Sequence, residues 1–145
     1  MKRGIDSNVL VYAHIPTFSE HAQVRMFLTE LLSQPEFVLV FTPAILHEFV
    51  HVITDGRRFA PPVEMNEALA VARLYIDREN TQCLPVVESD LTAAFDLLER
   101  HGLGRKRTAD TLFASTLLRH GVTDLITCNP DDFKVFEQLK VIDPR

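Results

Sequence analysis

The sequence predicts an α/β fold in which a central, mostly parallel sheet is flanked by helices on both faces. Short apolar runs alternate along the chain with longer segments whose apolar residues recur at helical spacing. This alternation is typical of parallel strands joined by helical crossovers. The chain has 145 residues, 46% of them hydrophobic, which is enough apolar surface for one core. We therefore expect a single domain that covers residues 1–145.

Five short apolar runs are predicted to form the strands. The first two cover residues 3–6 and 37–41, and a helical segment separates them. The other three cover residues 83–87, 122–127 and 139–142. Ligands of open α/β sheets bind beyond the carboxyl ends of the strands. Polar residues that directly follow these runs are therefore candidate site residues.

Apolar stripes between the strands, together with residues that favour helix ends, indicate the helices. Ser19 and Ser89 are predicted to cap two helices, and Pro43 suits the first turn of a third. The last predicted helix covers residues 108–120 and ends before Gly121.

Four acidic residues stand where apolar segments begin or end: Asp6, Glu48, Asp110 and Asp132. Folding would have to bring them together, and gathered carboxylates repel one another unless a cation neutralises them. Mg²⁺ and Mn²⁺ prefer oxygen ligands such as carboxylates. Such ions promote the hydrolysis of phosphodiesters by activating water and stabilising the leaving oxygen. The set therefore predicts metal-dependent phosphodiester chemistry.

The segments that carry these acids resemble the PIN domain family, and particularly the VapC-type ribonuclease toxins of toxin–antitoxin pairs. Glu48 matches the second acid of that family, and the matching motifs are Ile5-Asp6-Ser7-Asn8-Val9-Leu10-Val11-Tyr12, Asp110-Thr111-Leu112-Phe113-Ala114-Ser115 and Leu125-Ile126-Thr127-Cys128-Asn129-Pro130-Asp131-Asp132-Phe133. The resemblance implies a PIN-like fold and a Mg²⁺- or Mn²⁺-dependent endoribonuclease in which the four acids bind metal and catalyse. It also implies an RNA substrate, a cognate antitoxin protein and a homodimer.

The closing motif departs from the family at Asn129, where an acid is often found. An amide offers only a neutral carbonyl oxygen to a metal, so the fourth carboxylate must come from Asp132 or Asp131. Asp132 is favoured because it directly precedes Phe133, as in the family pattern. Asn129 is expected to support the site.

Two further polar residues and one basic run are expected to assist the acids. Asn8 and Thr127 are predicted to orient a carboxylate or a metal-bound water by hydrogen bonding, although Asn8 also suits the cap of the following short helix. The basic run just before Asp110 contains Arg105, Lys106 and Arg107. These three residues are candidates for binding the phosphates on either side of the cleaved bond.

Two other functions compete with this interpretation. The segment His47-Glu48-Phe49-Val50-His51 matches H-E-x-x-H, the zinc metalloprotease motif in which both histidines bind the metal. A protease would leave the other three acids without a role, and the sequence offers no clear third zinc ligand. The second alternative is a catalytically weak PIN-like RNA-binding module, which the neutral Asn129 would favour.

Net charge and hydropathy give expectations about the binding partners and the cellular location of the protein. A net charge of −5 is unusual for a nucleic-acid-binding protein, but two bound divalent cations would reduce it to −1. The chain has neither an apolar run long enough to span a membrane nor a signal-like start, so we expect a cytoplasmic location. Cys83 and Cys128 are expected to be reduced packing residues.

Overall fold

A five-stranded sheet forms the centre of the computed structural model, which describes residues 1–145. Every paired strand is parallel, and the strands lie in the order β3-β2-β1-β4-β5. Their bounds are β1 (Lys2–Ile5), β2 (Val38–Phe41), β3 (Thr81–Cys83), β4 (Asp124–Ile126) and β5 (Lys140–Ile142). The predicted α/β fold is therefore confirmed.

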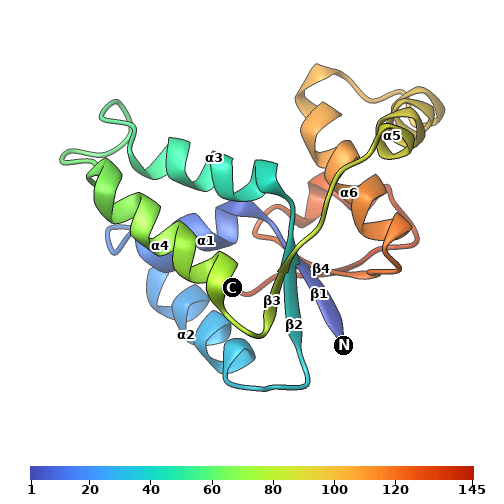
Figure 1. Cartoon of the computed structure of the whole chain (residues 1–145). Coiled ribbons are helices and arrows are strands. Elements are labelled where there is room, and N and C mark those ends of the chain that lie inside the picture. The colour runs from blue at the N-terminus through green and yellow to red at the C-terminus, as the bar shows by residue number, and fades with distance from the viewer.

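Helices cover both faces of the sheet, as predicted (Figure 1). One face carries α1 (Ser7–His14), α2 (His21–Leu32), α3 (Pro43–Ile53) and α4 (Met65–Asp77). The other face carries α5 (Glu88–Arg100) and α6 (Thr108–Arg119). Two 3₁₀-helices accompany them, η1 (Arg105–Arg107) before α6 and η2 (Pro130–Asp132) after β4.

The strand order reverses direction beside β1. The chain runs outward from β1 through β2 to β3, and then returns to place β4 on the other side of β1. Connections between parallel strands are right-handed, so connections that run in opposite directions across the sheet place their helices on opposite faces. The carboxyl ends of β1 and β4 therefore form a switch point, which is where open α/β sheets bind ligands.

The carboxyl-terminal halves of the inner strands are apolar because helices cover them on both sides, whereas β1 begins with Lys2 and Arg3 and β4 with Asp124. Fully buried strand residues include Ile5, Val40, Phe41, Leu125 and Ile126. Gly4 of β1 lets α6 approach closely, since a Cβ atom at this position would lie 2.8 Å from Cδ1 of Leu117. This close packing brings the helix that carries Asp110 against the strand that ends at Asp6.

Two predicted element ends agree with the structure. Pro43 is the first residue of α3, where its missing N–H is not needed. Gly121 follows α6 with a φ of 71°, a conformation that favours glycine.

Three other predicted element ends are wrong. Strand β3 ends at Cys83 and does not cover residues 83–87, because Pro85 has no N–H to continue the strand pairing. Ser19 does not cap α2, which has no side-chain cap. Ser89 does not cap α5, because Asp90 takes this role and accepts a hydrogen bond of 3.0 Å from the Val87 N–H.

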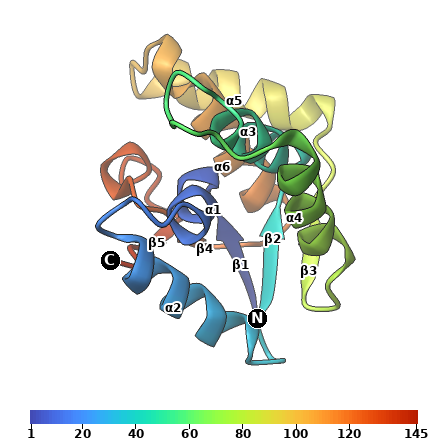
Figure 2. The same cartoon turned by 90° about the vertical axis from the view of Figure 1, so that its left-hand side faces the viewer.

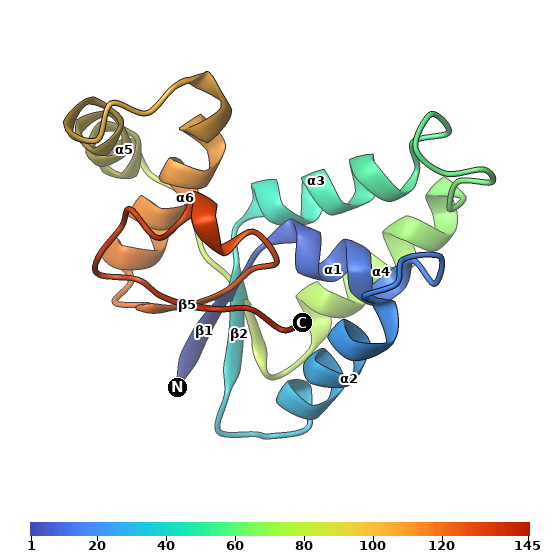
Figure 3. The same ribbon diagram turned by 180° about the vertical axis from the view of Figure 1, so that it is seen from behind.

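The candidate site residues gather at one end of the sheet. The N-terminus lies at the opposite end of β1 from α3 and α6 (Figure 2). Seen from behind, the segment after β4 passes between α6 and α1 (Figure 3). This segment contains Thr127, Asn129 and Asp132, so it can join the two groups of helices at the switch point.

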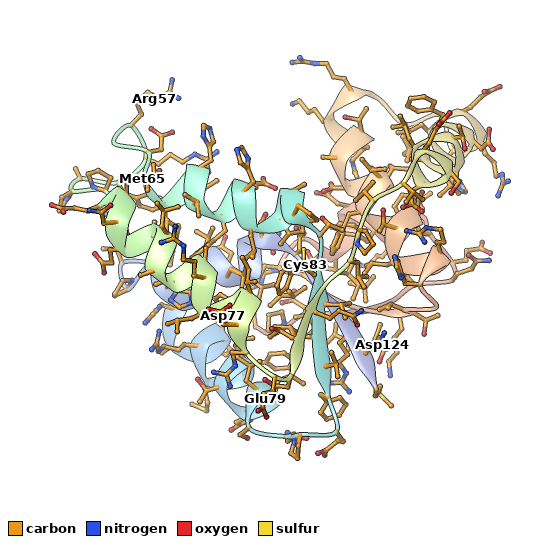
Figure 4. The ribbon with its side chains drawn as sticks, viewed as in Figure 1. Arg57, Met65, Asp77, Glu79, Cys83 and Asp124 are labelled. Carbon is orange, nitrogen blue, oxygen red and sulfur yellow. The ribbon has the colours of Figure 1, made fainter.

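No helix of this chain combines the length and the apolar character that a membrane crossing requires. Both cysteines are free, and Cys128 is buried as expected. Cys83 is exposed on β3 (Figure 4), so its expected role as a packing residue is wrong.

Candidate active site

Four acidic side chains from four separate parts of the chain line one pocket of about 490 Å³. Asp6 directly follows β1, Glu48 lies in the middle of α3, Asp110 lies in the first turn of α6, and Asp132 ends η2. The strand ends and helix starts that surround the switch point therefore bring together residues up to 126 positions apart in the sequence.

Hydrogen bonds from three neighbours hold the carboxylate of Asp6, which is 6% exposed. Its Oδ1 accepts a bond of 2.8 Å from the Ser7 N–H. Its Oδ2 accepts bonds from Nδ2 of Asn8 at 3.2 Å and from the hydroxyl of Thr127 at 2.9 Å. This observation agrees with the predicted orienting contacts of Asn8 and Thr127. Asp6 itself, rather than Asn8, caps α1.

Asn8 also connects the end of β1 to the segment after β4. Its Oδ1 accepts a hydrogen bond of 3.1 Å from the Cys128 N–H. The Thr127 hydroxyl oxygen in turn accepts a bond of 3.0 Å from the Asn129 N–H. Thr127 is fully buried, so the network is shielded from solvent on this side. Two adjacent strand ends are thereby held in a fixed relation to the Asp6 carboxylate.

Burial and like charges raise the pKa values of two of the acids. Burial is the main cause that raises the pKa of Asp6 to about 6, and the charges of Glu48 and Asp132 raise it further. Burial also raises the pKa of Asp110 to about 7, followed by the charges of Asp6, Asp132 and Glu48. Arg107 lowers the pKa of Asp110 by a smaller amount. The four acids therefore sense one another electrostatically, and a bound cation would favour their ionised forms.

Asp132 and Asp131 lie in different environments. Asp132 is partly exposed and lines the pocket with the other acids. Asp131 is exposed and its Oδ1 lies 2.8 Å from Nζ of Lys134, outside the pocket. This geometry favours Asp132 over Asp131 as the fourth acid. Asn129 also lines the pocket.

An arginine of the basic loop contacts the fourth acid. Nη1 of Arg107 lies 3.1 Å from Oδ1 of Asp132. Lys106 lines the pocket, whereas Arg105 does not. The three basic residues are therefore not equivalent, because one pairs with an acid, one borders the pocket and one lies outside its lining.

The donor set of the pocket suits a hard divalent cation, since four carboxylates and the Asn129 amide offer oxygen atoms. No three His, Cys, Asp or Glu side chains are close enough in this conformation to hold one ion together. Arg107 occupies Oδ1 of Asp132 in this conformation. The residues present fit a Mg²⁺ or Mn²⁺ site that forms when side chains converge on the ion.

The histidines of the H-E-x-x-H segment do not face this pocket. His47 and His51 are exposed on α3, with their rings stacked at a centroid distance of 6.5 Å. Only Glu48 of the motif lines the pocket with the acids. His51 instead borders a separate hollow with Arg57 and Asp55.

Sequence analysis missed the apolar part of the pocket. Tyr12 and Phe18 line it together with the acids. Arg58 also lines the pocket, and its place with Arg57 soon after the Glu48 helix makes these two arginines a weaker candidate for phosphate binding. Tyr12 lies four residues after Asn8 on α1, and this helical spacing was the one available signal. Phe18 comes from the loop after α1, where no periodicity marks it. Arg57, beside Arg58, points into solvent at the outer tip of its loop (Figure 4).

The PIN domain model matches residues 5–139, which is most of the chain. The chain belongs to the PIN domain family. Among curated relatives of this PIN domain, Ribonuclease VapC24 of Mycobacterium tuberculosis is 26% identical over 142 residues, covering 97% of this chain and 95% of the relative. Ribonuclease VapC43 of the same organism is 38% identical over 64 residues, covering 44% of this chain and 43% of the relative.

Solved structures share the PIN fold at low sequence identity. One is VapBC2 from Rickettsia felis bound to a DNA fragment from its promoter, with a TM-score of 0.68, 17% identity, and coverage of 99% of this chain and 98% of that chain.

Proposed function

We propose that this PIN domain protein is a metal-dependent endoribonuclease and the toxin of a toxin–antitoxin pair. One observation carries the proposal: the four acids spread along the sequence line a single pocket at the switch point of a PIN fold. The ribonuclease relatives, one of which aligns along almost the whole chain, support the same activity. The VapC toxin is thus the type of protein that this chain resembles in both sequence and fold.

In this proposal, Asp6, Glu48, Asp110 and Asp132 hold Mg²⁺ or Mn²⁺. The bound cation supplies an activated water and neutralises charge that develops on the phosphodiester. Hydrolysis of this kind leaves a 5′-phosphate and a 3′-hydroxyl group on the RNA products.

The chain's own residues would then prepare and position the reactants. Asn8 and Thr127 hold Asp6 by hydrogen bonds to its Oδ2 atom, so that it need not reorganise during the reaction. Lys106 borders the pocket and would bind phosphate beside the cleaved bond, with Arg105 and Arg107 as further candidates. Asn129 would contribute a neutral oxygen in a supporting role.

The partners and location belong to the same proposal. VapBC2 of Rickettsia felis was crystallised bound to a DNA fragment from its promoter, and another solved structure of this fold is a toxin–antitoxin complex from Klebsiella pneumoniae. By analogy we propose a cognate antitoxin protein, a homodimer and a cytoplasmic location for this chain. The single domain of residues 1–145 would then contain the complete nuclease site.

RNA cleavage in defined metal tests the proposed activity. We expect the wild type to cleave RNA with Mg²⁺ or Mn²⁺, and Asp6→Asn and Asp132→Asn to reduce the rate by at least about 100-fold. Asp131→Asn is a matched control, because this acid is exposed and pairs with Lys134 outside the pocket. Full activity in excess EDTA would rule out the metal-dependent mechanism, and metal-dependent RNA binding without cleavage would indicate the RNA-binding module instead.

A further inference from the structure

The pocket has an apolar end that metal binding does not explain. Val11, Tyr12, Phe18 and Val52 line it together with the four acids. Tyr12 and Phe18 are partly buried and pack against the hydrophobic core. The core therefore supports both rings, which also border the pocket. A site that only bound cations and phosphates would have no use for two aromatic side chains.

Helix α1 leads from the acidic end of the pocket to this apolar end. The α1 residues that line it are Ser7, Asn8, Val11 and Tyr12, whose spacing places them on one face of the helix. Because an α-helix rises about 1.5 Å per residue, Tyr12 lies roughly 9 Å along the helix from Asp6. The ribose and base of one nucleotide, attached to a phosphate at the acids, can reach this far.

The aromatic residues form a preorganised group. The rings of Tyr12 and Phe18 meet edge to face at a centroid distance of 4.7 Å, and Phe59 contacts Phe18 at 5.9 Å. Nδ1 of His21 lies 2.8 Å from the Tyr12 carbonyl oxygen, which ties the end of α1 to α2. Arg58 lines the same pocket and adds a positive charge beside the rings.

We propose that Tyr12 and Phe18 form a subsite for an unpaired nucleobase next to the cleaved phosphate. This inference rests on the proposed ribonuclease function and assigns the recognition of an unpaired base to these two side chains. Bases in a duplex are stacked and paired, whereas bases in loops and single strands can lie against aromatic side chains. Arg58 would bind the neighbouring phosphate or stack on the base.

Tyrosine fluorescence can report directly on this subsite. The chain has no tryptophan and two tyrosines, Tyr12 and Tyr75, so Tyr75→Phe leaves Tyr12 as the only strong emitter. In an Asp110→Asn background that blocks cleavage, we expect a short single-stranded RNA to quench Tyr12 emission saturably. The same RNA annealed into a duplex should leave it unchanged once light absorption by the RNA has been corrected for. The matched control is Tyr12→Phe in the same background, where buried Tyr75 reports only light absorption by the RNA.

Binding affinity gives a second and independent measurement. Loss of one stacking partner should weaken the binding of single-stranded RNA by roughly five- to 100-fold for Tyr12→Ala or Phe18→Ala in the Asp110→Asn background. The control for loss of an aromatic ring is Phe95→Ala, since Phe95 is exposed on α5, away from the pocket. Thermal melting identifies variants that have lost their fold, and Tyr12→Leu and Phe18→Leu replace any alanine variant that has.

The outcomes separate this inference from the proposed function. If folded Tyr12 and Phe18 variants bind single-stranded RNA as tightly as Phe95→Ala, the base subsite is wrong. Equal quenching by duplex and single strand would also overturn it. In both cases the wild type would still cleave RNA with Mn²⁺ if the proposed function is right. Absence of cleavage by the wild type would overturn the function itself.

Discussion

At the scale of single residues, burial is the main cause that raises the pKa of two acids of the metal-free site. Asp6 and Asp110 have pKa values raised to about 6 and about 7, while their ordinary value is 3.8. Between pH 4 and pH 7 these two carboxyl groups therefore bind more protons in the folded protein than in the unfolded chain. By linkage, the contribution of these acids to the free energy of unfolding decreases as the pH rises through that range.

The stability of Asp110→Asn tests this conclusion. We expect the metal-free wild type to lose stability relative to this variant between pH 5 and pH 8. Each tenfold change in proton affinity is about 1.4 kcal/mol, so the relative loss should be at least about 1 kcal/mol. Chemical unfolding in EDTA measures it. Burial lowers the pKa of His14 to about 4, so the contribution of His14 to the free energy of unfolding increases as the pH rises. This contribution is the same in the wild type and in the variant, and it cancels in the comparison.

A variant less stable than the wild type at pH 8 would show that the charged Asp110 serves the structure, for example by stabilising the first turn of α6.

The structure also corrects the expected surroundings of two histidines. His14 and His21 lie near Asp6 in the sequence, which alone predicts surface positions for them, with substrate contact as the alternative. His14 instead packs among aromatic residues, with Nε2 lying 2.7 Å from the Tyr75 hydroxyl. His21 is held by the Tyr12 carbonyl. Sequence spacing cannot reveal such a position, because it depends on how α1 packs against α3 and α4.

The two interpretations of Glu48 predict opposite rankings of variants. Glu48 lines the acidic pocket, whereas His47 and His51 do not. We expect Glu48→Gln to lower RNA cleavage by at least about 100-fold, because a neutral amide is a poor ligand for a hard cation. The double variant His47→Ala/His51→Ala should lose less than about fivefold. Loss of both stoichiometric zinc and all activity in that double variant would instead support the metalloprotease.

At the scale of elements, η1 and η2 approach each other through one ion pair. Arg107 ends η1 and Asp132 ends η2, and both side chains are about one-third exposed. In the proposed metal site, the guanidinium group would compete with the cation for the Asp132 carboxylate. This contact could not be predicted from the sequence. It depends on the packing of α6 and β4, which brings η1 and η2 together although they are far apart along the chain.

Removal of Arg107 should tighten metal binding. An exposed ion pair contributes about 1 kcal/mol or less, so we expect Arg107→Gln to lower the Kd for Mn²⁺ by roughly two- to fivefold at low salt. Lys106→Gln removes the same charge without breaking the ion pair and serves as the control. Calorimetric titration of both variants measures the difference. Equal effects of the two substitutions would mean that only the local charge matters and that Arg107 does not compete for Asp132.

The main elements could be predicted because their signals are local. Five apolar runs lie at or beside the five strands, and Pro43 and Gly121 mark helix ends as expected. The errors at Ser19, at Ser89 and in β3 occur where a tertiary contact or a proline overrides local preference. Asp90, for example, caps α5 while Nη2 of Arg119 on α6 donates to it at 3.1 Å.

At the scale of the whole molecule, the switch point between β1 and β4 explains why acids distant in sequence line the same pocket. The alternation of strands and helices predicts parallel strands, whose carboxyl ends share one edge of the sheet, so the position of Asp6 at that edge could be predicted. The strand order could not, because alternation is compatible with several orders. The apolar half of the pocket could not, because Phe18 lies in a loop. The net charge of −5 is also accounted for in part, since four of the acids face a site that suits cations.

Direct Mn²⁺ binding tests the central claim that these four carboxylates form one metal site. Titration followed by the electron paramagnetic resonance of free Mn²⁺ gives the affinity without any need for substrate. We predict that Asp6→Asn and Asp110→Asn each weaken binding by at least about tenfold, while Asp131→Asn leaves it unchanged. Mn²⁺ affinity equal to that of the wild type in both Asp6→Asn and Asp110→Asn would contradict the account.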